Sequence, residues 1–448
     1  MIRNLWNDLE GTFFPESALD FMPQSQLRQV QLQRLKAITA HAYANVDLFR
    51  KRMDERGLKP QDIRSLDDIR LLPFTVKSDL RDTYPYGLFA VPISEVVRLH
   101  ASSGTTGKPI VVGYTASDME VWKQVIMRTL YSAGFHRGDV VQNIYGYGLF
   151  TGGLGLHGGL EGIGATVIPI SGGNSERQIM VMKDFEVTAI CSTPSYFIHL
   201  IEVAQKMGLD FKRDLKVKRG VFGAEPWTDP MRDYIQQTTG VEAYDIYGLS
   251  EIIGPGVGAE CHCRDGLHIF EDHFLVEILD PETLEPVPDG QEGELVLTTL
   301  SKQAMPILRY RTRDITSIDA RPCGCGRSIR RIKRISRRSD DMFIIRGVNV
   351  FPSQIEIALL KTEANLPHYQ IVLTRKSGLD RMCVRVEVSG ELVGDRIADI
   401  ESLQKRFARS IEQITGLHAE IELVQPGTIP RSEGKAKRLF DKRNEEGV

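Results

Sequence analysis

Cysteine is scarce in this sequence, with six residues in a chain of 448. A disulfide scaffold is excluded, because so few cysteines cannot hold together a chain of this length. Long apolar runs are also missing: residues 146–160, part of the longest uncharged stretch, contain seven glycines, which make them a poor membrane span. The first residues lack the apolar core of a signal peptide. We therefore expect a cytoplasmic protein with reduced cysteines and no membrane partner.

Neither sign of charge is in large excess. The 56 Lys and Arg residues stand against 59 Asp and Glu residues, a net charge of −3. Without a basic surplus we expect no nucleic-acid partner. Hydrophobic residues make up 42% and charged residues 26%, which is typical of a folded globular protein and excludes a disordered chain, a collagen-like fibre and a coiled-coil rod.

Three regions follow one another along the chain. The first hundred residues space apolar side chains as a helix does, for example Leu27, Leu35 and Ile38. From about residue 96 to 257, short β-branched runs alternate with helical segments such as 118–133 and 175–184, which predicts βαβ units and a parallel sheet. Antiparallel strands are predicted over 268–279 and 293–299.

After about residue 338 the pattern changes to a compact α+β module. Strands are predicted at 344–345, 369–373, 382–388 and 420–424, and between the last two lies an amphipathic helix whose apolar stripe is Ile397, Ile400, Leu403, Phe407, Ile411 and Ile414. The fold class is therefore α/β. A large N-terminal domain over 1–338 has parallel or mixed sheets and helices, and a small α+β C-terminal domain occupies 340–448.

The sharpest local signal is the string Ser-Ser-Gly-Thr-Thr-Gly-Lys-Pro at residues 102–109. Its glycines allow backbone N–H groups to approach an anion closely, and its hydroxyls and lysine add further donors. It is not a Walker A loop, because only two residues separate the glycines and Pro109 follows the lysine. Taken alone, the string could equally be a polar turn between strands.

Three further groups of residues suit nucleotide binding. Within 243–251, Tyr247 can stack on a purine and Glu251 can bind Mg²⁺. Within 309–314, Asp314 stands among three arginines, either to take ribose hydroxyls or as part of a surface ion-pair network. Residues 430–435 end in Lys435, which by itself would be an ordinary solvated lysine.

In this order the motifs resemble the adenylate-forming superfamily of acyl-CoA synthetases, adenylation domains and luciferases. More narrowly, residues 101–109, 145–153 and 338–356 resemble the phenylacetate–CoA ligase family. The resemblance runs from about residue 101 to the end of the chain. It departs from the pattern at Ser250, where the superfamily often has Thr, and at Arg337, where Gly usually precedes the hinge arginine.

The resemblance implies ATP and CoA as substrates, Mg²⁺ as cofactor, and a homodimer. By the same resemblance, we expect the catalytic residues to be Lys108, Glu251 as the Mg²⁺ ligand, and Lys435, which would bridge the acid carboxylate and the α-phosphate. We expect Asp340 to be the hinge of a mobile C-terminal domain, so that Lys435 would enter for adenylation and leave when CoA is admitted. The ATP-binding set is Ser103, Gly104, Thr105, Thr106, Gly107, Gly223, Ala224, Glu225, Pro226, Asp245, Tyr247, Gly248, Ser250, Asp314 and Arg338. A basic run over 327–338 would lie near nucleotide or CoA phosphates.

Two Cys-x-Cys pairs, 261–263 and 323–325, predict a structural zinc site in the strand-rich region 260–327. The favoured ligands are Cys261, His268, Cys323 and Cys325, because relatives of this type use a Cys-His-Cys-Cys set. Cys263 is the reserve ligand, and unconnected thiols are the alternative to a metal site.

The leading interpretation is an ATP-dependent ligase that activates an aryl or arylacetic acid as acyl-AMP and transfers it to CoA. Tyr145, Tyr147 and Phe150 offer aromatic surface for a flat ring, although core packing would account for them as well. One alternative is a stand-alone enzyme that loads a carrier-protein thiol. The other is a non-catalytic nucleotide-binding relative, which the presence of Glu251, Asp314 and Lys435 argues against.

Overall fold

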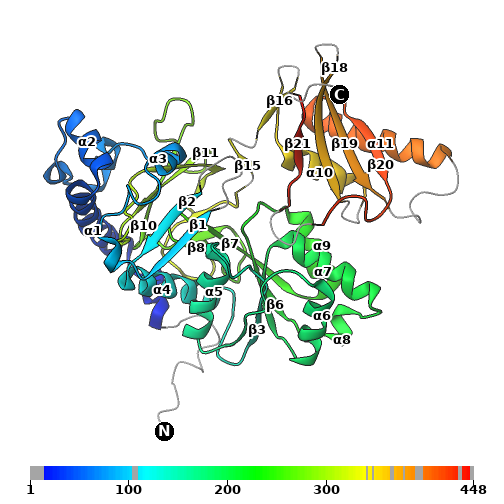
Figure 1. Cartoon of the computed structure of the whole chain (residues 1–448), viewed down its shortest axis with the longest axis horizontal. Coiled ribbons are helices and arrows are strands. Elements are labelled where there is room, and N and C mark those ends of the chain that lie inside the picture. The colour runs from blue at the N-terminus through cyan, green and yellow to red at the C-terminus, as the bar shows by residue number, and fades with distance from the viewer. Residues whose placement is uncertain are drawn as a thin grey trace, which may run out of the picture. The chain divides into compact units, whose positions relative to one another are not determined.

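The computed structural model describes residues 15–102, 109–335, 337–339, 342–345, 348–363, 368–376, 379–388, 397–431 and 436–443 (Figure 1). The chain divides into two compact units. Unit 1 contains Met1–Ser192, Arg213–Ala224 and Val241–Ile335, and unit 2 contains Thr193–Lys212, Glu225–Gly240 and Ser336–Val448. Unit 2 thus holds two segments of the α/β region in addition to the C-terminal module that the sequence predicts.

Among the described residues, nine strands of unit 1 form a mixed sheet in the order β13-β14-β9-β8-β7-β6-β5-β3-β4. The strands from β4 to β7 pair in parallel, which confirms the predicted βαβ region, and pairing becomes antiparallel from β7 onward. Their bounds are β3 Val140–Asn143, β4 Thr166–Ile168, β5 Ala189–Ser192, β6 Arg219–Phe222, β7 Glu242–Leu249, β8 Gly254–Ala259, β9 Leu267–Ile269, β13 Ile318–Asp319 and β14 Arg331–Ile332.

Two further antiparallel groups complete the strands of unit 1. The hairpin of β1 (Arg98–Ser102) and β2 (Ile110–Tyr114) flanks the predicted phosphate loop. Strand β11 (Gly293–Thr299) pairs with β10 (Phe274–Leu279) on one side and β12 (Tyr310–Thr316) on the other. The register of β11 against β12 shifts between Glu294 and Val296, so β12 is irregular where it carries Asp314.

The helices before residue 193 are η2 Pro15–Phe21, α1 Gln24–Asn45, α2 Asp47–Glu55, η3 Pro60–Asp62, η4 Leu66–Leu71, α3 Lys77–Asp82, η5 Ile93–Glu95, α4 Ala116–Ser132, α5 Thr151–Gly162 and α6 Ser175–Asp184. Helix α4 begins with a capping box, because Thr115 and Asp118 bond each other's backbone N–H. None of the described helices combines the length and apolar composition that a membrane span requires.

The glycine-rich stretch of the sequence becomes helix α5, which packs closely on α4. A Cβ at Gly155 would lie 2.4 Å from the Trp122 ring, and one at Gly159 would lie 2.1 Å from Ile126. Side chains at these positions would push the two helices apart. Gly155 and Gly159 are therefore explained by the close packing of α5 on α4.

Unit 2 contains the helices α7 Pro194–Lys206, α9 Asp229–Thr239, α10 Pro352–Thr362 and α11 Ile397–Thr415. Its strands are β15 Arg337–Arg338, β16 Phe343–Ile345, β17 Val348–Val350, β18 Tyr369–Lys376, β19 Leu379–Glu387, β20 Glu420–Val424 and β21 Leu439–Asp441; the short helix α8 (Phe211–Asp214) crosses the boundary between the units in the chain. The last four strands form a sheet in the order β20-β19-β18-β21. Its core combines α10, α11 and the sheet, with Ile355, Phe407 and Ile371 fully buried. The predicted α+β module is thus confirmed.

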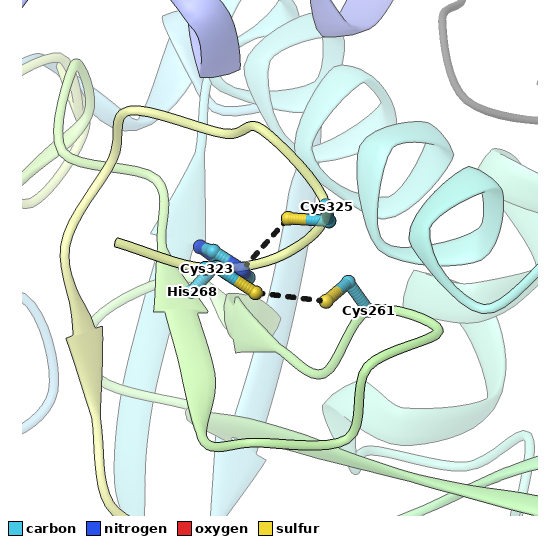
Figure 2. A group of neighbouring side chains, drawn as sticks. All are labelled: Cys261, His268, Cys323 and Cys325. Atoms are coloured by element: carbon cyan, nitrogen blue, oxygen red, sulfur yellow. Dashed lines mark hydrogen bonds between the residues drawn. The ribbon is translucent and has the colours of Figure 1, made fainter. Parts of the chain in front are cut away.

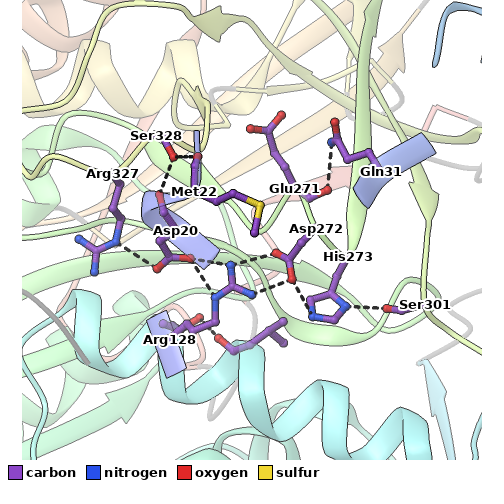
Figure 3. Close-up of polar contacts among 12 residues, drawn as sticks. Asp20, Met22, Gln31, Arg128, Glu271, Asp272, His273, Ser301, Arg327 and Ser328 are labelled. Atoms are coloured by element: carbon purple, nitrogen blue, oxygen red, sulfur yellow. Dashed lines mark hydrogen bonds and ion pairs between the residues drawn. The ribbon is translucent and has the colours of Figure 1, made fainter. Parts of the chain in front are cut away.

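A buried ion-pair network ties the first described segment of unit 1 to its core (Figure 3). The guanidinium of Arg128, on α4, binds the carboxylate of Asp20 at 2.5 Å and that of Asp272 at 2.9 Å. Arg327 binds the second oxygen of Asp20 at 3.2 Å. All four side chains are buried, so each charge needs its partner: an unpaired buried charge would cost several kcal/mol.

Candidate active site and metal centre

Glu251, the predicted Mg²⁺ ligand, lies in the turn between β7 and β8. A Cβ at Gly248 would come within 1.9 Å of the carbonyl oxygen of Gly254, so only glycine allows the two strands to approach this closely. Ser250, the next predicted residue, contacts the hydroxyl of Thr151 through its own hydroxyl at 3.0 Å. The turn that presents Glu251 is therefore anchored to the start of α5.

The side chain of Glu251 is 7% exposed. Its Oε1 accepts a hydrogen bond from the Tyr310 hydroxyl at 2.6 Å, and its backbone oxygen accepts one from Lys302 Nζ at 3.1 Å. Among the described residues, Oε2 has no hydrogen-bond donor. One carboxylate oxygen is thus oriented by the protein, and the other remains available to a cation.

Strand β12 brings a second carboxylate, that of Asp314, close to the C-terminal end of β7. Asp314 is buried, and its Oδ2 accepts a hydrogen bond from the Tyr247 hydroxyl at 2.6 Å. Since Tyr310 contacts Glu251, two side chains of β12 meet residues 247–251. The structure therefore brings together three residues that the sequence predicts in one site.

Asp245 makes a different contact. Its Oδ2 accepts from Arg334 Nε at 2.9 Å. Other arginines of the basic run are also paired: Arg327 with Asp20, Arg330 with Glu271 at 2.7 Å, and Arg331 with Asp265 and Asp319. The expectation that this run as a whole faces phosphates is wrong, because these arginines neutralise carboxylates of unit 1.

The predicted adenine segment 223–226 divides at the unit boundary. A Cβ at Gly223 would lie 2.6 Å from the carbonyl oxygen of Ile246, and Ala224 has a left-handed φ of 69°. In unit 2, the carboxylate of Glu225 accepts from the backbone N–H of Ser195 at 2.8 Å and of Ala436 at 3.1 Å. Burial raises the pKa of Glu225, although these hydrogen bonds oppose the shift. This carboxylate therefore holds backbone, a role that the sequence does not reveal.

The three predicted acid-pocket aromatics lie in different environments. Tyr145 is buried in the core and donates to the Ser192 carbonyl at 2.6 Å, whereas Phe150 is 52% exposed. The Tyr147 hydroxyl accepts from Asn143 Nδ2 at 2.8 Å and lies 3.1 Å from Nδ1 of His157. Burial raises the pKa of Tyr147 to about 12. Of the three, Tyr145 behaves as a core residue.

The remaining predicted site residues are placed only in part. Arg338 is in β15 of unit 2, half-buried. The phosphate loop 103–108, the hinge Asp340 and the catalytic Lys435 lie outside the described residues. Pro226 is described, in unit 2. Tyr310 and Lys302 were not assigned roles from the sequence, because a lone Tyr or Lys beside a motif carries no spacing signal.

A separate cluster of soft ligands lies in unit 1 (Figure 2). Ligand atoms of Cys261, His268, Cys323 and Cys325 all lie within 4.8 Å of one another. The sulfurs of Cys261 and Cys323 are 3.7 Å apart, and Cys325 Sγ is 3.4 Å from His268 Nε2. Cys261 follows β8, His268 is in β9, and the other two lie in the loop between β13 and β14. The connection after β8, the strand β9 and the loop between β13 and β14 thus converge on one point.

The donor set fits a structural zinc ion. His268 Nδ1 is 3.2 Å from the carbonyl oxygen of Ile329, which orients the ring so that Nε2 faces the three sulfurs. The reserve ligand Cys263 belongs to a second group, with Cys261 and His262. His262 and Cys263 are more exposed than the four clustered ligands, so this second group is the less enclosed of the two.

Comparison with known proteins gives matches over most of the chain. The AMP-binding enzyme family matches residues 89–302, and the AMP-binding enzyme C-terminal domain matches residues 347–443. Phenylacetate-coenzyme A ligase of Pseudomonas putida is 52% identical over 422 residues, which cover 93% of this chain and 94% of the relative. That of Thermus thermophilus is 48% identical over 439 residues, which cover 95% and 98%.

Solved structures agree in fold. A 2-hydroxyisobutyryl-CoA ligase in the postadenylation state, in complex with 2-HIB-AMP, superposes with a TM-score of 0.89 at 28% identity, covering 97% of this chain and 95% of that one. A benzoate CoA ligase from Burkholderia xenovorans has a TM-score of 0.58 at 16% identity, covering 77% and 68%, and so shows the fold alone. The chain therefore belongs to the phenylacetate–CoA ligase family of AMP-forming, adenylate-forming enzymes.

Proposed function

We propose that this chain activates phenylacetate, or a closely similar arylacetic acid, with ATP and transfers the acyl group to CoA. The observation that carries the proposal is the pair of contacts from β12 to residues 247–251. The Tyr247–Asp314 and Tyr310–Glu251 contacts support a role for Glu251 with Mg²⁺ and for Asp314 with the ribose hydroxyls. The 48–52% identity to phenylacetate–CoA ligases supports the class of acid.

The reaction has two displacements. A carboxylate oxygen of the acid attacks the α-phosphorus of ATP, the bond to pyrophosphate breaks, and an acyl-adenylate forms. The CoA thiol then loses its proton and attacks the acyl carbon, and AMP leaves with the oxygen that came from the acid. The first step brings two anions together, so positive charge and oriented donors must supply most of the stabilisation.

Glu251 would hold Mg²⁺ through Oε2, with Oε1 oriented by Tyr310. A bound Mg²⁺ would neutralise phosphate charge as the pyrophosphate leaves. Asp314, oriented by Tyr247, would accept from the ribose hydroxyls. We retain the phosphate loop 103–108, the catalytic Lys435, the hinge Asp340 and the domain limits 1–338 and 340–448 as parts of this proposal.

The test is release of AMP and pyrophosphate over a panel of acids, with and without CoA. Phenylacetate should give the highest kcat/KM, ahead of benzoate, 2-hydroxyisobutyrate and octanoate, and thioester should appear only with CoA. A holo carrier protein replaces CoA in a parallel reaction. Preference for the carrier thiol would favour the carrier-loading alternative, and no AMP release with any acid would favour a non-catalytic protein.

We also propose that Cys261, His268, Cys323 and Cys325 bind a structural Zn²⁺. The four ligand atoms lie within 4.8 Å of one another, and the Ile329 carbonyl orients the histidine. Three thiolates and an imidazole are typical of closed structural zinc sites. The site lies outside the nucleotide motifs, so its metal supports the fold and takes no part in the chemistry.

We propose further, from the resemblance, that the protein is a homodimer and, from its composition and charge, that it is cytoplasmic without nucleic-acid or membrane partners. Analytical ultracentrifugation of the full chain measures the oligomeric state directly. A single species at the monomer mass would contradict the dimer.

A further inference from the structure

Lys302 is a buried lysine that the proposed chemistry does not use. It lies in the connection between β11 and β12 and is 2% exposed. Its ammonium forms no direct ion pair with a carboxylate of the described residues. Burial lowers the pKa of Lys302 to about 8, and the more distant carboxylates of Asp118 and Glu251 offset only part of that shift. Burying an ammonium group is costly without such a partner. An apolar residue of the same length would fill the space at lower cost, so the charge itself needs an explanation.

The ammonium of Lys302 is directed at the backbone of Glu251, the proposed Mg²⁺ ligand. Lys302 Nζ donates to the backbone oxygen of Glu251 at 3.1 Å and lies 4.8 Å from the centroid of the Tyr114 ring. The face of that ring attracts a cation, which offsets part of the desolvation cost. The Glu251 carbonyl and the Tyr114 ring thus hold the ammonium beside the turn that carries Glu251.

Other side chains fix the same turn without a charge. The Tyr114 hydroxyl donates to the Ile253 carbonyl at 3.0 Å, and Trp122 Nε1 donates to the Pro255 carbonyl at 2.9 Å. The rings of Tyr114 and Trp122 are stacked, with centroids 4.7 Å apart. The turn would therefore keep its path through neutral hydrogen bonds alone.

The loop that carries Lys302 does not need the ammonium either. Both oxygens of the Asp118 carboxylate accept from its backbone, at 2.6 Å from Gln303 N and 2.9 Å from Ala304 N. Asp118 is itself held at the start of α4 by the backbone N–H of Thr115. The path of the loop is thus set by backbone hydrogen bonds to a carboxylate, which also attracts the Lys302 ammonium from a distance, while the ammonium's own hydrogen bond goes to Glu251.

We infer that Lys302 is a positioning residue for Glu251: its ammonium orients the Glu251 backbone and places a fixed positive charge behind the Mg²⁺ and phosphate site. The inference rests on the proposed function, because it assumes that Glu251 holds Mg²⁺ on ATP. It predicts that Lys302 sets the affinity for Mg·ATP and has little influence on the acid.

The test compares Lys302→Met, Lys302→Gln and Lys302→Arg with wild type. Mg·ATP carries a net negative charge, so loss of one positive charge near the bound phosphates should raise the KM for Mg·ATP, measured at a fixed excess of Mg²⁺, about tenfold in the Met and Gln variants. The KM for phenylacetate should change less than about twofold, and Arg should restore most of the affinity for Mg·ATP. The Gln variant keeps a donor for the Glu251 carbonyl, so it isolates the charge should the Met variant fold poorly.

Tyr114→Phe is the matched control, because it removes a neutral hydrogen bond from the same turn and leaves the ammonium. A KM for Mg·ATP in this variant raised as much as in Lys302→Gln would overturn the inference. A wild-type KM for Mg·ATP in Lys302→Gln, or an equal rise in the KM for the acid, would also overturn it.

Calorimetric titration of Mg·ATP in the absence of acid separates this inference from the proposed function. Weaker Mg·ATP binding by Lys302→Gln would support the inference even if wild type released no AMP with any acid. If wild type is active and Lys302→Gln binds Mg·ATP as tightly as wild type, the proposed function stands and the role of Lys302 is rejected.

Discussion

His273 shows how a single buried side chain acquires an unusual protonation state. Its Nε2 lies 3.0 Å from the Asp272 carboxylate and its Nδ1 lies 2.6 Å from the Ser301 hydroxyl. A neutral ring that donates from Nε2 and accepts at Nδ1 satisfies both contacts. Burial lowers the pKa of His273 to about 4, because it outweighs the attraction of Asp272, and Arg128 and Arg34 repel a second positive charge.

We predict that this histidine makes the protein acid-sensitive. The unfolded chain binds a proton at His273 near pH 6.5 and the folded protein only near pH 4, so stability falls as the pH drops through this window. The loss should reach about 3 kcal/mol. Burial opposes ionisation of Asp272, but Arg128 and His273 lower its pKa to about 2, so Asp272 adds its own loss only below this window.

Urea unfolding between pH 4 and 7 measures the effect. His273→Gln should flatten the pH dependence, since the amide replaces both hydrogen bonds and does not titrate. The control is His136→Gln, whose ring is largely exposed. A slope unchanged in His273→Gln would show that other groups govern acid unfolding.

At the same scale, sequence and structure contribute different residues to the site. Glu251, Tyr247 and Asp314 could be predicted because they fall within motifs of a known family. Tyr310 and Lys302 could not, because their role comes from the contact of β12 and its preceding loop with a turn far away in the chain. Glu225 falls in a predicted motif, but its carboxylate accepts hydrogen bonds from the backbone N–H groups of Ser195 and Ala436, which lie outside that motif.

At the scale of elements, periodicity predicts the helices and strands well and their interruptions poorly. Helix 175–184 and helix α11 agree with the predicted segments. The strand predicted over 268–279 is instead two, β9 and β10, separated by a turn at 270–273. The break has a physical cause: Asp272 leaves the strand pattern to meet Arg128, a long-range ion pair that local spacing cannot reveal.

The zinc cluster belongs to this scale, because it joins the β8–β9 connection and strand β9 to the loop between β13 and β14. We predict that Cys325→Ser lowers zinc content and the melting temperature together, the latter by more than about 5 °C. Elemental analysis and calorimetry measure the two quantities. Cys383→Ser, in β19 of unit 2, is the matched control and should change neither.

Cys263→Ser tests the reserve ligand in the same assay. If Cys263→Ser loses zinc and Cys325→Ser retains it, Cys263 and not Cys325 is the ligand. Full zinc and unchanged melting in Cys325→Ser would contradict a structural metal bound by that residue.

At the scale of the whole molecule, Lys435 is separated from the nucleotide motifs by more than a hundred residues of chain and by the predicted hinge at Asp340. We predict that Lys435→Ala slows adenylation by about 10²- to 10³-fold, as loss of one preorganised charged donor does. Thioester formation from synthetic acyl-adenylate and CoA should stay near the wild-type rate, because this lysine is withdrawn in that step.

Rapid-quench measurement of the two half-reactions checks this division of labour. Lys437→Ala is the matched control, since its ammonium is exposed and lies 4.8 Å from the Phe440 ring centroid. Equal slowing of both half-reactions in Lys435→Ala would mean that the lysine supports structure rather than the first step.

The carboxylate of Asp20 has a practical consequence for shortened versions of this protein. Helix α1 begins at Gln24, and a truncation made at that point would keep every α-helix intact. It would nevertheless strip Arg128 and Arg327 of a shared counterion inside the core, a loss of about 3–5 kcal/mol. The safe limit for trimming is therefore set by the 3-10 segment Pro15–Phe21, whose Asp20 carboxylate neutralises two distant arginines.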